Sequence, residues 1–189
     1  MDALVMCGGR GTRLDADAEK PLVDVGGEPM VDRVLGALSD SDVGTAYAVV
    51  SPHGPDTRAH LESRVPLVET PGDGYVADLG VALADERVSR PVLTVAADLP
   101  LLDGPAVDRV LDAHEGGSLT VAVSADRKRD LGASVDSTFD RDGRELAPSG
   151  VNVVGPSGAA ERTLVVDDAR LAVNVNRPVD RTVAERLLD

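Results

Sequence analysis

The chain of 189 residues contains one cysteine and no long apolar segment. A single cysteine cannot form an internal disulfide, and a chain of this length can bury a sizeable core without one. The longest apolar runs are far shorter than the roughly 20 residues that a membrane-spanning helix needs. Because no basic segment followed by a long apolar stretch stands at the start of the sequence, we also expect no signal peptide and a cytoplasmic location.

Lysine is nearly absent although acidic residues are abundant. The sequence has 24 Asp, 9 Glu and 17 Arg, its only lysines are Lys20 and Lys128, and the formal net charge is −14. Such a balance provides no basic stripe for nucleic acid. An Asp-rich, Lys-poor composition resembles that of proteins from a high-salt cytoplasm, where salt screens self-repulsion. We therefore expect Lys20 to have a specific role and Lys128, within an Arg-Lys-Arg run, to be exposed.

Apolar β-branched runs alternate with segments of helical periodicity. Several runs are continuous, as in strands of a parallel sheet covered on both faces. Apolar residues at helical spacing occur in 31–38, in 107–114 and in a stripe of Val179, Val183 and Leu187. This alternation predicts a single domain over 1–189, a three-layer α/β/α fold with a mostly parallel twisted sheet. The expected strands are 3–6, 46–50, 92–96, 119–123, 151–154 and 164–166.

The segment 125–150 differs from the rest of the chain. It is polar and charged, and glycine and proline interrupt it. We expect an irregular excursion with a short hairpin there, and no linker between domains.

A glycine-rich loop after the first expected strand is the most informative segment. It reads CGGRGTRL over residues 7–14 and is followed by EKPL over 19–22. Glycines let the backbone approach a ligand closely, and successive loop N–H groups can bind an anion. The loop is neither a Walker loop, which ends in Gly-Lys-Ser/Thr, nor the dinucleotide fingerprint, because Leu14 replaces the third glycine. It predicts a polyphosphate site formed by Gly8, Gly9, Arg10, Gly11 and Thr12, with positive charge from Arg13 and Lys20.

A carboxylate, Asp98, follows the expected strand 92–96. Ligands of open α/β sheets bind beyond the carboxyl ends of strands. Mg²⁺ on a triphosphate takes one or two protein oxygens and completes its shell with phosphates and waters. We therefore predict that Asp98 holds Mg²⁺; the alternative is a turn or cap residue before Pro100.

Two asparagines near the end of the chain alternate with valines. Alternation points Asn174 and Asn176 to the same side of an extended segment, where they can coordinate the metal or bind the acceptor. The alternative, that one of them caps the helix beginning at Pro178, applies more readily to Asn176.

Two more segments contain candidate binding residues. A loop with Gly72 and Gly74 opens an expected helix and can place backbone groups against a base or a phosphate. Asp78 in this helix either accepts a hydrogen bond from a guanine amino group or lies on a solvated face. Asn152, within an apolar strand, needs partners if it is buried, and either satisfies a neighbouring loop or faces the acceptor. No Ser/His/Asp or Cys/His spacing supports covalent catalysis.

The glycine loop together with Lys20-Pro21-Leu22 resembles the signature of the nucleotidyltransferase superfamily, whose members make nucleoside-diphosphate sugars and similar conjugates. The resemblance implies that the loop wraps a triphosphate, that Lys20 contacts phosphate, and that Asp98 binds the metal. It also implies an Asn-Val-Asn element close to the metal residue, here 174–176.

Further segments narrow the resemblance to one branch. These are GDGYVADL over 72–79, ADL over 97–99 and PSGVNVV over 148–154. With them, nearly the whole chain resembles the archaeal GTP:adenosylcobinamide-phosphate guanylyltransferases of cobalamin assembly, although the resemblance includes no motif in 125–147. The resemblance alone implies guanine, the substrates GTP and adenosylcobinamide phosphate, and the products adenosylcobinamide-GDP and pyrophosphate.

The roles that follow are specific. Arg13, Lys20 and Asp98 are the expected catalytic residues, and Asp98 and Asn176 the expected Mg²⁺ ligands. Binding is expected from residues 8–12 and from Gly74, Asp78, Asn152 and Asn174. Alternatives on the same fold are a molybdenum-cofactor guanylyltransferase and a sugar-phosphate nucleotidyltransferase, and a different class is a nucleotide-binding regulator without turnover.

Overall fold

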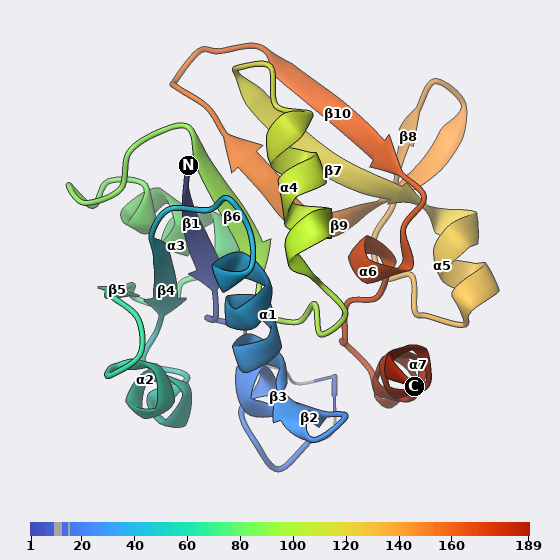
Figure 1. The fold of residues 1–189 in the computed structure, drawn as a ribbon, viewed down its shortest axis with the longest axis horizontal. Helices are drawn as coiled ribbons and strands as arrows, with labels where there is room; N and C mark the ends of the chain where they lie inside the picture. Colours follow the sequence, from blue (N-terminus) through green and yellow to red (C-terminus); the bar gives the residue numbers. More distant parts are fainter. Residues whose placement is uncertain (10–12, 15) are drawn as a thin grey trace.

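A computed structural model describes residues 1–9, 13–14 and 16–189. Its centre is an eight-stranded sheet made of β1 (Asp2–Met6), β4 (Ala46–Val50), β5 (Leu67–Glu69), β6 (Val92–Ala96), β7 (Ser118–Ser124), β8 (Phe139–Arg141), β9 (Arg144–Val154) and β10 (Glu161–Val166). The strand order is β10-β7-β9-β6-β1-β4-β5, with β8 paired to β9 (Figure 1). The pairs β4–β5, β1–β4, β1–β6 and β7–β10 are parallel, and β9 runs antiparallel to its neighbours β6, β7 and β8.

Helices cover the sheet. They are α1 (Met30–Ser39), α2 (Pro55–Leu61), α3 (Tyr75–Ala82), α4 (Gly104–Asp112), α5 (Ala125–Leu131), α6 (Ala169–Ala172) and α7 (Pro178–Leu188), with a short 3-10 turn η1 (Lys20–Leu22) and a small ribbon of β2 (Asp24–Val25) and β3 (Glu28–Pro29). In Figure 1, α1 and α4 lie in front of the sheet and α3 lies behind it. Among the described residues, no helix is long and apolar enough to cross a membrane.

The two faces of the sheet have separate apolar cores because side chains alternate along each strand. In β1, Ala3 and Val5 pack with residues of α1 and α4, whereas Leu4 packs on the other face with Ala82 of α3. The predicted three-layer α/β/α architecture with a mostly parallel sheet is therefore confirmed.

The segment 125–150 is more regular than expected. Its hairpin is confirmed as β8–β9, but β9 begins at Arg144, well before the expected strand 151–154, and helix α5 was missed. The helix has clear end signals: the Ser124 side chain accepts a hydrogen bond from the Arg127 N–H, and Gly132 ends the helix with φ of 80°.

The apolar stripe expected in the last helix is wrong in part. Val183 is buried, but Val179 is 49% exposed and Leu187 is 39% exposed. The buried side of α7 is formed by Asp180, Val183 and Ala184, because the carboxylate of Asp180 is needed inside to bind the start of the helix.

Candidate active site

A cavity of about 630 Å³ opens beyond the carboxyl ends of β1, β4 and β6. Met6, Val49 and Ala96, one from each strand, form part of its lining. The three strands are parallel, so their carboxyl ends meet at one edge of the sheet, where α/β folds bind ligands. Cys7, Gly8 and Gly9, the loop before α3 and Asp98 complete the described walls.

Lys20, Asp98 and Asn176 meet at the edge of this cavity. The Lys20 Nζ donates to Asp98 Oδ2 at 2.5 Å and to Asn176 Oδ1 at 2.7 Å. The side chains of Lys20 and Asp98 are each 15% exposed, so the ion pair is largely shielded from water. The structure thus brings together three of the residues predicted from sequence, although 78 and 156 positions separate them from Lys20.

The Asn-Val-Asn element points its amides into the site because its valines point away from it. Val173 and Val175 are fully buried in a cluster with residues of α7, and the Val175 N–H donates to the Asp98 carbonyl at 2.9 Å. The Asn174 Nδ2 donates to Asp98 Oδ1 at 3.1 Å. The expected convergence of Asn174 and Asn176 is therefore present.

Neither asparagine side chain caps the last helix. Asp180 takes that role: its Oδ2 accepts from the backbone N–H groups of Asn176 at 3.0 Å and Arg177 at 2.9 Å. The amide oxygen of Asn176 is bonded to Lys20 instead. The helix-cap alternative is thus wrong for both asparagines.

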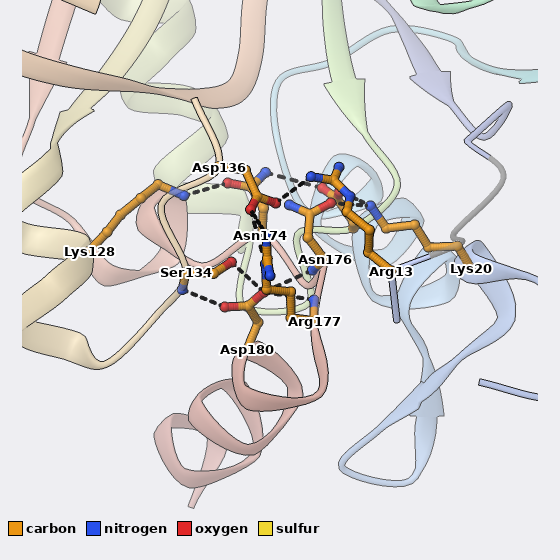
Figure 2. Close-up of polar contacts among 10 residues, drawn as sticks. Arg13, Lys20, Lys128, Ser134, Asp136, Asn174, Asn176, Arg177 and Asp180 are labelled. Carbon is orange, nitrogen blue, oxygen red and sulfur yellow. Dashed lines mark hydrogen bonds and ion pairs between the residues drawn. The ribbon is translucent and has the colours of Figure 1, made fainter. Parts of the chain in front are cut away.

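The expectation that Lys128 is exposed is wrong. It is 5% exposed, and its Nζ donates to Asn174 Oδ1 at 3.0 Å (Figure 2). The reason is helix α5, which packs against β7, β9 and α6 and turns Ala125 and Lys128 inward. Burial lowers the pKa of Lys128, and the nearby charges of Asp98, Asp180 and Asp136 oppose that shift.

Asp78 lies against the glycine loop. It is 3% exposed, so the solvated-face alternative is wrong, and its Oδ1 accepts from the Gly72 N–H at 2.9 Å. A Cβ added to Gly8 would lie 3.3 Å from Asp78 Oδ2, so the first loop glycine permits this close approach. Gly72 and Gly74 have φ of 80° and 110°, which favours glycine at both positions.

The remaining predicted residues make other contacts or lie outside the cavity lining. Arg13 is bound to Asp136 at 2.8 Å, and Arg177 binds the same carboxylate at 2.8 Å (Figure 2). Asn152 pairs with Thr94 in the middle of the sheet and is not among the described residues that line the cavity. The predicted residues Arg10, Gly11 and Thr12 lie outside the part of the chain that the structure describes.

Comparison with known proteins identifies the class. The model of the MobA-like NTP transferase domain matches residues 3–177. The adenosylcobinamide-phosphate guanylyltransferase of Methanocaldococcus jannaschii is 31% identical over 202 residues, which cover 100% of this chain and 97% of that protein. The bifunctional protein GlmU of Maricaulis maris is 36% identical over 126 residues, but these cover 64% of this chain and only 27% of GlmU.

Solved structures agree on the fold. A hypothetical transferase from Thermus thermophilus matches with a TM-score of 0.70 at 20% identity, over 95% of this chain and 98% of its own. The CMP:2-keto-3-deoxy-manno-octonic acid synthetase in complex with CTP matches with a TM-score of 0.67 at 14% identity, over 99% of this chain and 97% of its own. The chain belongs to the MobA-like NTP transferase family and is a nucleotidyltransferase, as the motifs predicted.

Proposed function

We propose that this chain, acting as a single domain, transfers GMP from GTP to adenosylcobinamide phosphate. The observation that carries the proposal is the meeting of Lys20, Asp98 and Asn176 beside a cavity of about 630 Å³. The choice of substrates is supported by a relative of that name that matches all of the chain at 31% identity.

The reaction is an in-line displacement at the α-phosphorus of GTP. A phosphate oxygen of the acceptor forms the new P–O bond while the bond to the β-phosphate breaks, and pyrophosphate leaves with the electron pair. The acceptor phosphate is already ionised near neutral pH, so no general base is required. The protein mainly positions the reactants and neutralises charge.

Lys20 is suited to charge neutralisation. Its ammonium lies at the cavity edge, where it can stabilise the charge that grows on the α-phosphate and the leaving pyrophosphate. The backbone of Gly8 and Gly9 lines the same cavity and would hold the β- and γ-phosphates. Arg13 would join them after exchanging Asp136 for a phosphate oxygen.

The residues around Lys20 fit a magnesium ion. Asp98 Oδ2 and Asn176 Oδ1 converge on one cationic atom at 2.5 and 2.7 Å, and such a pair of oxygens suits Mg²⁺ that also binds phosphates. No group of three or more His, Cys, Asp or Glu in the described ranges could hold a metal by itself. Mg²⁺ bound by Asp98 and Asn176 would neutralise triphosphate charge.

Base recognition is assigned to Asp78 and to the start of α3. Asp78 lines the cavity and has Oδ2 beside Gly8, so it can accept from the amino group of guanine. Gly74 at the start of α3 would bring backbone groups to the same base.

Pyrophosphate release tests the proposal. GTP, ATP, CTP and UTP would each be supplied with Mg²⁺ in high KCl, with and without adenosylcobinamide phosphate. We expect rapid release only with GTP and this acceptor together. Release with a molybdenum-cofactor precursor or a sugar phosphate instead would assign another transferase activity. Tight GTP binding without release for any acceptor would favour the regulator.

A further inference from the structure

The only two lysines of the chain donate to the same small cluster. Lys20 binds Asp98 and Asn176, and Lys128 binds Asn174, which in turn binds Asp98. In Figure 2 the two lysines approach from opposite sides, with the asparagines between them.

The position of Lys128 is unfavourable for a residue without a function. Its side chain is 5% exposed, and the one hydrogen bond found for its ammonium among the described residues goes to a neutral amide oxygen. Asp98, Asp136 and Asp180 act on it electrostatically, yet no ion pair joins Lys128 to a described carboxylate within 4.0 Å. A buried cation without a direct counter-ion lowers stability.

The hydrogen bonds of Asn174 indicate what Lys128 does. Both donors of the Asn174 Nδ2 are used, on Asp98 Oδ1 at 3.1 Å and on the Ser149 carbonyl at 3.0 Å, and Oδ1 accepts from Lys128. A reversed amide would place its oxygen against two acceptors and its NH₂ group against the ammonium. The ammonium therefore acts together with these two acceptors to select one of the two amide orientations.

We propose that Lys128 is a positioning residue, which orients the Asn174 amide so that its nitrogen holds Asp98 Oδ1 and leaves Oδ2 directed at Lys20. Gly150 supports the arrangement, because its φ is 87° and a Cβ there would lie 2.9 Å from the Asn174 Nδ2. The kinetic consequence rests on the proposed function, whereas the amide orientation does not.

The kinetic test is a double-mutant cycle of Lys128→Met and Asn174→Ala. Methionine keeps most of the side-chain length and removes the charged donor. We expect kcat to fall by about 10- to 100-fold in Lys128→Met, with KM for GTP changed less than about threefold, because the substitution disturbs the orientation of the Asp98 carboxylate. The double variant should be no slower than Asn174→Ala alone, since Lys128 acts through Asn174.

Stability separates this role from a structural one. Lys128→Met should melt at the wild-type temperature or above it, because it removes a buried cation. Arg129→Met is the matched control: it loses the same charge from the same helix, but Arg129 is exposed and binds Asp126 and Glu145 on the surface. Its kcat should equal that of the wild type. An unfolded Lys128→Met, a kcat within twofold of wild type, or effects that multiply in the double variant would overturn the proposal.

The orientation can be tested without any substrate. The ¹⁵N side-chain amide signals of Asn174, assigned by their loss in Asn174→Ala, should shift or broaden in Lys128→Met and stay unchanged in Arg129→Met. Unchanged signals in Lys128→Met would contradict the proposal. If the wild type releases no pyrophosphate with any acceptor, the proposed function fails, and these signals still decide the role of Lys128.

Discussion

At the scale of single residues, the site depends on the ion pair of Lys20 and Asp98. Its side chains are neither fully buried in the core nor fully exposed at the surface. Lys20 and Asp98 neutralise one another at 2.5 Å while both line the cavity. When substrate binds, a phosphate would replace Asp98 as the partner of Lys20, and a metal ion would replace Lys20 as the partner of Asp98. The pair therefore holds both groups in place before substrate arrives, which preorganises the site.

This interpretation predicts that the double variant of the ion pair regains stability but not activity. Lys20→Met and Asp98→Asn should each lower kcat by about a hundredfold or more, because each removes a contact to developing or metal-bound charge. The double variant should regain part of the stability that either single variant loses, since no unpaired charge remains, but it should stay inactive. Pyrophosphate release and thermal melting measure the two effects.

A surface variant controls for general loss of charge. Arg58→Met removes an exposed arginine that binds Glu62 and Glu69 and is not among the described residues that line the cavity, and it should keep full activity. Near-normal turnover in Lys20→Met or Asp98→Asn would remove that residue from the catalytic set.

At the scale of elements, helix α2 is tied to the lysine turn by a carboxylate. Glu19 directly precedes η1, and its two oxygens accept from the backbone N–H groups of Asp56 at 2.9 Å and Thr57 at 2.7 Å. These are N–H groups of the first turn of α2, which have no partner inside the helix. Glu19 therefore caps a helix distant in sequence and fixes the start of the Lys20 turn.

We predict that Glu19→Gln destabilises the protein by about 1 kcal/mol at pH 7, the usual size of a lost helix cap. Burial alone would raise the pKa of Glu19, but the hydrogen bonds from the backbone N–H groups of Asp56 and Thr57 lower it. A pKa lowered in the folded state gives stability that is present above the unfolded pKa. That stability is lost as pH falls through the folded pKa.

The stability difference between wild type and Glu19→Gln should therefore be largest near neutral pH and shrink in acid. Urea unfolding at pH 7 and near pH 3 measures it. A difference that is absent at pH 7, or that grows in acid, would show that Glu19 does not stabilise α2 as a charged cap.

The helices and strands also differ in how well the local sequence pattern predicts them. The strands with continuous apolar runs and the helices α1 and α4 were predicted, because their periodicity is set by the local pattern. Helix α5 was missed because its segment is polar, although Ser124 and Gly132 mark its two ends. The burial of Lys128 could not be read from local pattern, since its partner Asn174 lies 46 residues away in sequence.

At the scale of the whole molecule, the proposed triphosphate site lies in a strongly acidic protein. The chain carries a net charge of −14. Among the described residues that line the cavity, Lys20 is cationic, whereas Asp73, Asp78 and Asp98 are acidic. The overall charge would repel a triphosphate, and salt screens this long-range repulsion more than it screens the shielded contact of Lys20 with Asp98.

The excess of negative charge predicts that salt stabilises the fold. Raising KCl from 0.1 to 1 M shortens the screening length from about 10 Å to about 3 Å, which weakens the repulsion among surface carboxylates. Exposed ion pairs weaken too, but each contributes only about 0–1 kcal/mol. We therefore expect the melting temperature to rise with KCl.

As a control, the triple variant Glu86→Gln, Asp130→Asn, Glu161→Gln changes exposed acids. It should melt higher than wild type at low salt and gain less from KCl, because less repulsion remains to be screened. A melting temperature that falls with KCl, or a triple variant with the wild-type salt response, would mean that self-repulsion does not limit the stability of this protein.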